Sequence, residues 1–405
     1  MNACTFNENG RAAGLRLALF SGNYNYTRDG ANQALNRLVA YLVSEGAAVR
    51  VYSPTTDTPA FEPAGDLVSV PSMPIPGRGE YRVALPLPRR LRQDILDFAP
   101  TAIHLSAPDL LGVQARRMGA RLGAPVVASL HTRFETYLSY YGFGWLRPAA
   151  ERYLAGFYGG CDCVLAPNNP IAELVKAQAP KTKVSIWSRG VDRSRFSPAR
   201  RDPAWRREMG LGDKDVAVMF LGRLVQEKGL DIFVRTFERL AARPNIRPMV
   251  VGDGPAGAWL RSRLPQGVFT GFLTDAALGR AVASADIMFN PSQTEAFGNA
   301  TLEAMAAGLA VVCPDVPSTR ELVTPDVDGV LTGSRDAAGF AEAIGRLADH
   351  PAVLARLGAA ARKTSGRYDW AASCATVLDV YEALGGTSRA ARPFDGQAQR
   401  RAAYG

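Results

Sequence analysis

The sequence predicts an α/β protein with two doubly wound domains, each built on a parallel sheet. Short apolar stretches alternate with amphipathic helical stretches along most of the 405 residues, and this alternation is typical of parallel sheets. The alternation starts again at Val216, after a polar and basic segment broken by Pro198. A chain of this length also exceeds what one simple core usually holds. We therefore expect two domains, joined by a linker at 189–202.

The first domain is expected over residues 1–188. Its first strand reads LRLALF (Leu15–Phe20), and a polar loop then leads into a helix, because Leu35 and Leu38 recur at helical spacing ahead of a glycine at 46. A second helix is expected at 110–123, and the remaining apolar stretches give candidate strands at 48–53, 101–106, 125–130 and 163–167.

The second domain is expected over residues 203–369. Its first strand is Val216–Gly222, a helix follows at 230–242, and further apolar stretches give candidate strands at 247–252, 286–292 and 310–314. One more helix is expected at 370–386. The last stretch, 387–405, is basic and has little apolar periodicity, so we expect a disordered tail.

Composition narrows the class of protein. No apolar run is long enough to predict a transmembrane helix, and the polar N-terminus does not resemble a signal peptide, so a cytoplasmic location is expected. The formal charge of +9 is compatible with phosphorylated substrates or an anionic membrane surface. No nucleic-acid-binding motif is evident, and the five scattered cysteines do not suggest zinc. We therefore expect no nucleic acid partner, no bound metal and no cofactor.

The stretch FLGRLVQEKGLD (220–231) follows a predicted strand and opens a helix. Arg223 would leave the strand end, and Lys228 would lie near the N-terminus of the next helix. Two cations beside a positive helix end suit a diphosphate. The alternative is a pair of solvated surface charges. The later stretch VVGDGPAG (250–257) is interpreted equally well as a plain turn or as a ligand-contacting loop.

The stretch PSQTEAFGNATLEAMAAG (291–308) carries two glutamates at a strand-to-helix connection. Glu295 lies on the loop, and a Phe-Gly-Asn turn leads into the helix, where Glu303 is expected in the first turn. There a carboxylate suits the helix dipole and can accept two hydrogen bonds from a diol such as a ribose. The backbone N–H groups at Gly298, Asn299 and Ala300 could bind a phosphate or sugar hydroxyls. The alternative for Glu303 is a helix cap.

These motifs together resemble the retaining glycosyltransferases of family 4, which have the GT-B fold of two Rossmann-like domains facing a central cleft. FLGRLVQEKG followed by SQTEAFGNATLEAMAAGLAVV is similar to their pattern, and two glutamates with seven residues between them are typical of the family. RDGANQALNRLVAYL, HLSAPDLLG, SLHTRFETYLSYYG and RGVDRSRFSP extend the resemblance over most of the chain. The form SRGVD, with Arg189, is similar to a subgroup that includes bacterial α-mannosyltransferases and sulfoquinovosyl-type glycolipid transferases. A hinge salt bridge is the alternative role of Arg189.

The resemblance implies a role for each candidate residue. The second domain would hold a nucleotide-sugar donor, with Arg223 and Lys228 on its diphosphate and Glu303 on its ribose. Glu295 and the backbone at Phe297, Gly298 and Asn299 would face the transferred sugar. In the first domain, His131 in LHTRFETY would contact that sugar, and Gly30 in RDGAN would let the backbone approach the donor. Taken alone, His131 is also compatible with a purely structural role. The final helix would cross back onto the first domain.

The implied chemistry is hexosyl transfer with retention of the anomeric configuration. No Asp-x-Asp metal motif is evident at a strand end, so Arg223 and Lys228 would stabilise the leaving nucleoside diphosphate. A same-face attack, in which the departing phosphate helps to deprotonate the acceptor, is favoured over a double displacement through Glu295. Arg223, Lys228, Glu295 and His131 are therefore the candidate catalytic residues.

Donor and acceptor are less constrained. A UDP-sugar is slightly favoured over GDP-mannose. A lipid or lipid-linked acceptor is expected, because the stretches at 77–96 and 134–159 mix arginines with aromatic or apolar residues, which suits an anionic membrane surface. Ordinary helix packing explains the same residues nearly as well. A soluble polysaccharide- or disaccharide-forming enzyme, and a sugar-nucleotide sensor without catalytic activity, are the alternative functions.

Overall fold

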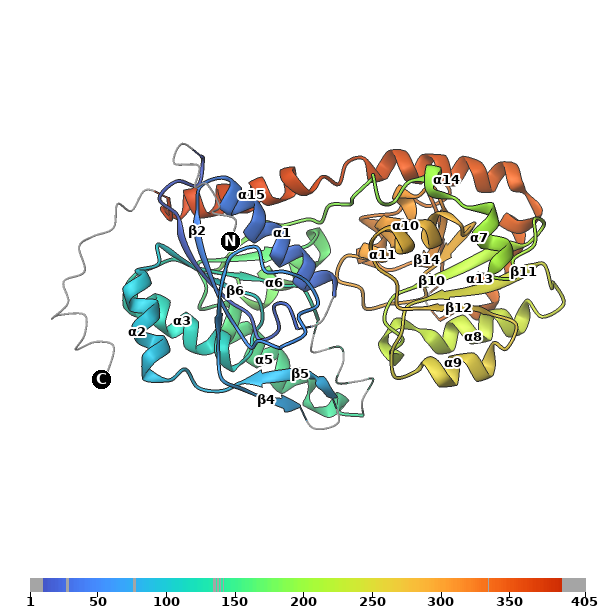
Figure 1. The fold of residues 1–405 in the computed structure, drawn as a ribbon. Coiled ribbons are helices and arrows are strands. Elements are labelled where there is room, and N and C mark those ends of the chain that lie inside the picture. The colour runs from blue at the N-terminus through green and yellow to red at the C-terminus, as the bar shows by residue number, and fades with distance from the viewer. Residues whose placement is uncertain are drawn as a thin grey trace. The chain divides into compact units, whose positions relative to one another are not determined.

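The computed structural model of the chain describes residues 10–26, 29–75, 78–133, 136, 138, 140, 142–333 and 335–387. The chain divides into two compact units (Figure 1). The first comprises Met1–Thr132, Leu146–Ser188 and Trp370–Gly405, and the second comprises Arg133–Trp145 and Arg189–Asp369. The predicted tail at 387–405 lies outside the described residues apart from Thr387.

The first unit is built on a parallel sheet with the strand order β3-β2-β1-β6-β7-β8-β9. Every pairing in it is parallel, and β4 and β5 form a separate antiparallel pair. The strands are β1 (Arg16–Phe20), β2 (Ala48–Ser53), β3 (Asp66–Ser69), β4 (Ser72–Ile75), β5 (Arg78–Ala84), β6 (Ala102–Leu105), β7 (Val126–Ser129), β8 (Cys163–Ala166) and β9 (Lys183–Ile186).

Helices cover both faces of this sheet. Side chains of Asp29, Asp109 and Asn168 accept hydrogen bonds from the first turns of α1, α3 and α6 and so fix where these helices begin. The helices are α1 (Gly30–Ser44), α2 (Arg89–Phe98), α3 (Leu110–Leu122), α5 (Arg147–Tyr158), α6 (Asn169–Gln178) and α15 (Trp370–Ala383). The short 3-10 helix η1 (Gly144–Leu146) precedes α5 directly, and its first two residues are assigned to the second unit.

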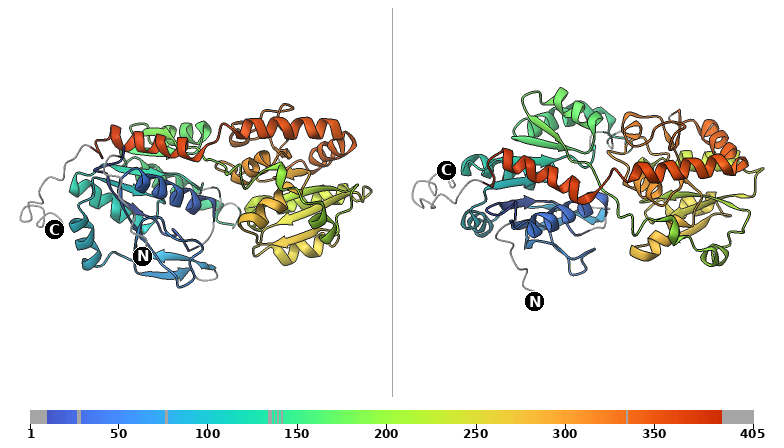
Figure 2. Two further views of the ribbon diagram at one scale, coloured as in Figure 1. Left: turned by 45° about the horizontal axis from the view of Figure 1, so that its top comes forward. Right: turned by 90° about the horizontal axis from the view of Figure 1, so that it is seen from above.

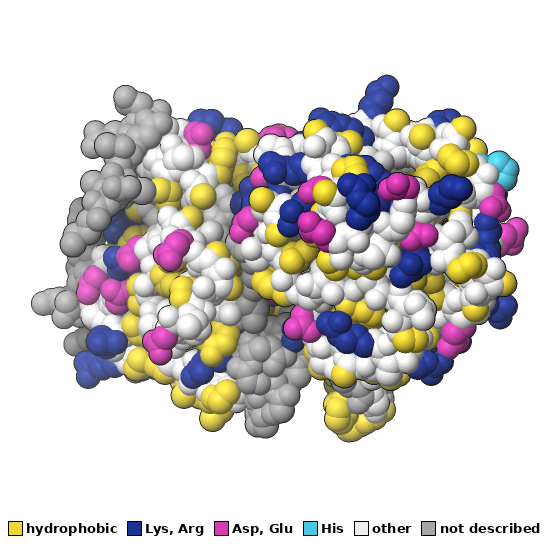
Figure 3. Space-filling model, turned by 45° about the vertical axis from the view of Figure 1, so that its right-hand side comes forward, with side chains coloured by type: hydrophobic (Ala, Val, Ile, Leu, Met, Phe, Trp, Pro, Cys, Tyr) yellow, Lys and Arg dark blue, Asp and Glu magenta, His cyan; other side chains and the backbone are white. Residues whose placement is uncertain are grey.

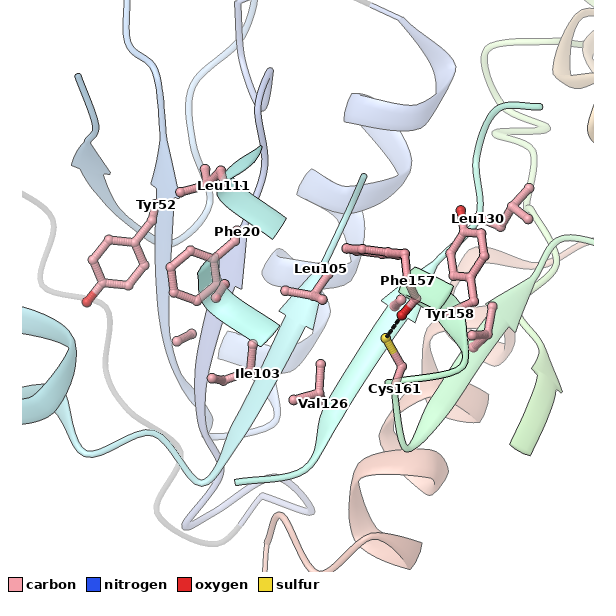
Figure 4. Packing of buried hydrophobic residues seen from close by; sticks show 14 of the residues in the cluster. Phe20, Tyr52, Ile103, Leu105, Leu111, Val126, Leu130, Phe157, Tyr158 and Cys161 are labelled. Atoms are coloured by element: carbon pink, nitrogen blue, oxygen red, sulfur yellow. Dashed lines mark hydrogen bonds between the residues drawn. The ribbon is translucent and has the colours of Figure 1, made fainter. Parts of the chain in front are cut away.

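The first core lies between the sheet and α2, α3, α5 and α6 (Figure 4). In it the rings of Phe20 and Tyr52 stack with centroids 4.9 Å apart. The second core, on the opposite face, joins α1 and α15, which lie side by side (Figure 2). Because both faces are covered, the central strands are buried and largely apolar, as the sequence pattern indicated.

The second unit repeats this architecture with the parallel strand order β12-β11-β10-β13-β14-β15. Its strands are β10 (Val216–Leu221), β11 (Ile246–Val251), β12 (Val268–Gly271), β13 (Ile287–Phe289), β14 (Ala310–Pro314) and β15 (Val330–Thr332). Its helices are η2 (Pro198–Arg200), α7 (Pro203–Glu208), η3 (Gln226–Lys228), α8 (Leu230–Arg239), α9 (Gly257–Arg263), α10 (Asp275–Ala283), α11 (Asn299–Ala306), α12 (Pro317–Arg320), α13 (Ala337–Asp349) and α14 (Pro351–Ser365).

Two cores again lie on the two faces of the sheet. On one face Phe220, Phe233, Phe289 and Phe340 form a row of ring contacts, with centroids 4.8 to 5.7 Å apart, that joins the sheet to α8 and α13. On the other face α10 and α11 supply the apolar side chains. Both units are therefore doubly wound Rossmann-like domains, and the predicted fold class is confirmed.

Each sheet has one point at which the chain reverses the direction in which it adds strands. In the first unit this point lies between β1 and β6, and in the second it lies between β10 and β13. Connections leave in opposite directions at such a point, so the loops beyond the carboxyl ends of the two strands leave a crevice where ligands of doubly wound folds bind. The loops after β10 and β13 carry most of the predicted donor-binding residues.

Candidate active site

The loop after β10 holds Arg223 and Lys228, as predicted. Lys228 ends η3, and its ammonium Nζ donates to Oε1 of Glu295 over 2.6 Å. The two side chains are 29% and 20% exposed, so the pair is partly shielded but open to a ligand. The structure thus brings together two of the four predicted catalytic residues, from the two loops that flank the switch point.

The connection at 290–294 holds this pair in place. The Asn290 side chain donates to Thr301 Oγ1 (3.0 Å) and accepts from the backbone N–H of Ser292 (3.1 Å). The hydroxyls of Ser292 and Thr294 donate to the backbone carbonyl of Glu227 over 3.4 and 3.3 Å. These contacts tie the loop after β13 to η3, so the residues next to Glu295 and Lys228 are fixed against each other.

The glycines after β11 have a structural role. Gly252 adopts a φ of 136°, and a Cβ on it would come within 2.0 Å of the carbonyl oxygen of Gly222. Gly254 has a φ of 158°, and a Cβ there would lie 2.6 Å from the carbonyl oxygen of Leu224. The loops after β10 and β11 therefore pack backbone against backbone. Close backbone packing is thus sufficient to explain Gly252 and Gly254 in VVGDGPAG, and neither the plain turn nor the ligand-contacting loop is needed for them.

The turn before α11 leaves backbone donors for a ligand. Gly298 occupies the N-cap position with a φ of 101°, and no side chain caps the helix. Phe297 is almost buried, with its ring against Tyr368 at a centroid distance of 5.7 Å. Among the described residues, Asn299 Oδ1 is buried without a hydrogen-bond partner. The first N–H groups of α11 are thus available to an anion or a sugar hydroxyl.

Glu303 is not in the first turn of its helix, contrary to expectation. The helix begins at Asn299, directly after the left-handed Gly298, so Glu303 is the fifth helical residue and lies one turn further along. The dipole argument for a carboxylate in the first turn therefore fails. The capping alternative fails too, because the reciprocal position of a capping box is occupied by Thr301. Glu303 is half-buried.

Gly30 and His131 belong to the first unit. Gly30 is the first residue of α1, directly after the capping Asp29 and beyond the end of β1 at the switch point. His131 lies two residues after β7, half-buried, with its ring against Trp187 at a centroid distance of 5.3 Å. Its Nε2 is 2.8 Å from Ser129 Oγ. The Arg189 side chain, in the second unit, is only 4% exposed.

Behind His131 lies a second histidine that the sequence analysis did not single out. His104, on β6, is fully buried, and burial lowers its pKa to about 3. Its Nε2 is 2.9 Å from Ser129 Oγ, and its Nδ1 is 2.6 Å from the hydroxyl of Tyr381 on α15. A histidine inside the apolar stretch TAIHLS was the available signal.

Among the described residues, no group of three or more His, Cys, Asp or Glu side chains is placed to hold a metal ion. No described helix has both the length and the apolar character needed to cross a bilayer. On the face shown in Figure 3, basic and acidic side chains are interspersed over the second unit rather than separated into patches of one sign.

Doubly wound domains with cationic and acidic side chains beside a switch point define a class of nucleotide-binding α/β proteins. Comparison with known proteins narrows this class. Residues 28–195 match the family model described as Glycosyltransferase Family 4, and residues 215–350 match Glycosyl transferases group 1. A GDP-mannose-dependent alpha-mannosyltransferase of Mycolicibacterium smegmatis is 32% identical, over 91% of this chain and 98% of that protein. The chain therefore belongs to glycosyltransferase family 4 and is a glycosyltransferase.

Further comparisons agree with this assignment. Sulfoquinovosyl transferase SQD2 of Arabidopsis thaliana is 28% identical, over 88% of this chain and 71% of that protein. Among solved structures, sucrose-phosphate synthase of Thermosynechococcus elongatus superimposes with a TM-score of 0.76 at 20% identity, covering 91% of this chain and 98% of that one. WaaG, a glycosyltransferase involved in lipopolysaccharide biosynthesis, gives a TM-score of 0.66 at 17% identity, with 90% and 99% covered. The fold is GT-B.

Proposed function

We propose that this glycosyltransferase moves a mannosyl unit from GDP-mannose to a lipid or lipid-linked acceptor, with retention of configuration and without a metal ion. The observation that carries the proposal is the Lys228–Glu295 pair at the switch point of the second unit. It combines a cation suited to a diphosphate with a carboxylate suited to sugar hydroxyls. The sequence alone slightly favoured a UDP-sugar. The GDP-mannose-dependent relatives, which match over nearly the whole chain, support GDP-mannose instead.

The diphosphate would lie between the loop after β10 and the N-terminus of α11. An ammonium has three N–H donors, and Lys228 uses one on Glu295. The other two would reach the diphosphate, together with Arg223 and the N–H groups of Gly298 and Asn299. As the bond to the sugar breaks, negative charge grows on the diphosphate, and these fixed donors stabilise it without reorganisation.

The remaining groups would position the sugar and the nucleoside. Glu295 would accept hydrogen bonds from the transferred sugar, and Glu303 would accept them from the ribose. We propose that the backbone at Gly30 closely approaches the donor and that His131 contacts the sugar. Same-face attack of the acceptor, with the leaving diphosphate taking its proton, gives retention. It needs no further base.

The acceptor proposal rests on relatives and on surface residues. The relatives include SQD2 and an alpha-monoglucosyldiacylglycerol synthase of Streptococcus pneumoniae that is 25% identical over 80% of this chain. Trp145 on η1 is 76% exposed and Tyr153 on α5 is 48% exposed, and aromatic side chains of this kind suit a membrane interface. In the stretch at 77–96, by contrast, Leu87 and Leu91 are buried in the core, so ordinary packing explains its leucines.

The test is a transfer assay with purified protein, a lipid extract, and either GDP-mannose or UDP-sugars. We expect an α-linked mannolipid from GDP-mannose, formed equally well in the presence of a chelator. If a glycolipid formed only from a UDP-sugar, the donor would be that UDP-sugar and not GDP-mannose. Loss of activity on chelation, with recovery on adding a divalent metal, would show that an ion shares the diphosphate charge. Binding of a sugar nucleotide without transfer to any lipid or soluble acceptor would favour a sensor.

A further inference from the structure

A continuous row of hydrogen bonds runs through the first unit and ends at His131. It passes from the Tyr381 hydroxyl to His104 Nδ1 (2.6 Å), from His104 Nε2 to Ser129 Oγ (2.9 Å), and from Ser129 Oγ to His131 Nε2 (2.8 Å). His104, Ser129 and Tyr381 are 0%, 2% and 0% exposed. The row therefore joins β6, β7 and α15 in an interior where a change of hydrogen-bond direction cannot be compensated by bulk water.

The protonation states of Tyr381 and His104 determine which atom donates in the hydrogen bond between them. Burial raises the pKa of Tyr381 well above its ordinary value, so its phenol is protonated. The only hydrogen-bond partner of that hydroxyl among the described residues is His104 Nδ1. A buried O–H left without an acceptor is costly, so Tyr381 donates and His104 Nδ1 accepts. The lowered pKa keeps His104 neutral, and its single proton is then on Nε2.

The same reasoning leaves two possible directions for the proton of Ser129. His104 Nε2–H donates to Ser129 Oγ, whose own proton has two acceptors in reach. These are His131 Nε2 at 2.8 Å and the backbone carbonyl of Leu105 at 3.5 Å. A serine proton directed at Leu105 would make a bond at the outer limit of hydrogen-bond length, whereas His131 Nε2 offers it an acceptor at 2.8 Å. We therefore assign Ser129 as the donor to His131.

We propose that Tyr381, His104 and Ser129 are positioning residues that hold His131 as the neutral tautomer with its proton on Nδ1. His131 Nε2 is then occupied as an acceptor, and Nδ1–H is the ring's donor. If His131 contacts the sugar, which rests on the proposed function, it does so as a hydrogen-bond donor and not as a base. This agrees with a reaction in which the leaving diphosphate takes the acceptor's proton.

The test is direct, because the chain contains only three histidines. Protein labelled with ¹⁵N-histidine gives two-bond ¹H–¹⁵N correlation spectra in which each neutral tautomer has its own pattern. The exposed His350 is assigned by its loss in His350→Gln. We expect His104 to be protonated on Nε2 and His131 on Nδ1 at neutral pH, in full-length protein without any donor.

Two variants test the coupling. Ser129→Ala removes the proton donated to His131, and we expect the Nε2–H tautomer of His131 to appear and turnover to fall by about tenfold or more, with GDP affinity unchanged. Tyr381→Phe frees His104 Nδ1, and we expect mixed tautomers at both histidines. The matched control is Tyr24→Phe, which removes another fully buried hydroxyl from the same core, one that donates to Asn36 Oδ1 over 2.6 Å. It should leave both tautomers as in the wild type.

The results that would overturn the hydrogen-bond row differ from those that would overturn the proposed function. A wild-type His131 with its proton on Nε2, or on both nitrogens at neutral pH, overturns the inference whether or not the enzyme transfers sugar. Unchanged His131 tautomers in Ser129→Ala overturn it too. The expected tautomers in a protein that transfers no sugar would count against the proposed function and leave the hydrogen-bond direction standing.

Discussion

Lys228 and Glu295 form an ion pair in which the two side-chain charges neutralise each other. On the proposed function, a donor diphosphate would share or replace the carboxylate as the partner of the ammonium. We therefore propose two roles for Glu295, as the holder of Lys228 before the donor binds and as a contact of the sugar afterwards. Substitutions at the two ends of the pair should have different effects.

At Lys228 the expected effect is on turnover. Lys228→Ala should lower kcat by about 10²-fold, because one charge-stabilising donor is lost from the leaving diphosphate. Arg223→Ala should have an effect of similar size. Steady-state rates with GDP-mannose provide the measurement. Lys176→Ala is the matched control, since it removes an exposed lysine paired with Glu173 in the first unit. Rates within a few-fold of wild type for Lys228→Ala would contradict the diphosphate role.

The two glutamates should differ in calorimetric titration with GDP. Glu303→Gln should weaken GDP binding by about 1.5–3 kcal/mol, because it removes a charge-assisted hydrogen bond to the ribose. Glu295→Gln should leave GDP affinity nearly unchanged and lower turnover, because its contact matters as charge develops on the sugar. If Glu303→Gln binds GDP like the wild type, the ribose assignment is wrong.

At the scale of single residues, the sequence placed Arg223, Lys228 and Glu295 on the connections after β10 and β13, where the structure has them. It could not show that Lys228 and Glu295 pair, because they are 67 positions apart and meet only through the order of the strands. It also placed Glu303 in the wrong helical turn, since the start of α11 depends on the left-handed backbone of Gly298. A pattern of residue types does not specify that conformation.

At the scale of elements, the loops after β10 and β11 form one packed unit. Gly252→Ala should destabilise the second unit by roughly 1–3 kcal/mol, because the new Cβ meets the Gly222 carbonyl in a left-handed backbone conformation. Thermal unfolding measures the effect. The control is Gly156→Ala, in the interior of α5 with no atom within 4 Å of the added Cβ, which should be neutral or stabilising. Equal melting temperatures for the two variants would contradict this packing argument.

The exposed residues of η1 and α5 give a prediction about membranes. Trp145→Ser should reduce flotation with anionic liposomes, because an exposed tryptophan can insert at the headgroup level. Trp259→Ser, on α9 of the second unit and 41% exposed, is the matched control and should float like the wild type. Flotation that is absent for wild type, or equal for both variants, would count against a membrane role for η1.

The strands that were not predicted from the sequence share a simple physical property. The central strands were predicted because they are buried on both faces and read as apolar runs. The missed parallel strands β3, β9, β12 and β15 are the edges of the two sheets. β3 and β9 each have exposed ends and only half-buried centres, so their sequences lack the continuous apolar pattern. The β4–β5 pair was missed because its arginines suggested a surface segment.

At the scale of the molecule, the first unit is assembled from separated stretches of chain. Cys374, Val377, Leu378 and Tyr381 on α15 are at most 1% exposed and complete the core beside α1. We predict that a protein truncated after Asp369 loses the cooperative unfolding of the first unit and retains that of the second. Calorimetric unfolding of the truncated and full-length proteins tests this. Two intact transitions in the truncated protein would show that α15 is dispensable.

The sequence alone could not reveal the hydrogen-bond row that ends at His131, because the row also joins separated stretches of the chain. Its members come from β6, the end of β7 and α15, and Tyr381 is 277 positions from His104. The family resemblance pointed to His131 alone. Only the placement of the last helix against the first sheet reveals what holds that ring.

The assembly of the first unit from separated stretches of chain also has a consequence during synthesis. The ribosome makes most of the first unit early, but α15 emerges only after the whole of the second unit. The face of the first sheet that awaits Val377 and Leu378 must therefore stay uncovered while roughly half of the chain is still being translated. The second unit, although later in the chain, is therefore the one whose two cores can both close earlier, because only one of the two cores of the first unit is complete without α15. A nascent chain of this enzyme thus has a period in which chaperone binding would protect an apolar surface that the finished molecule never exposes.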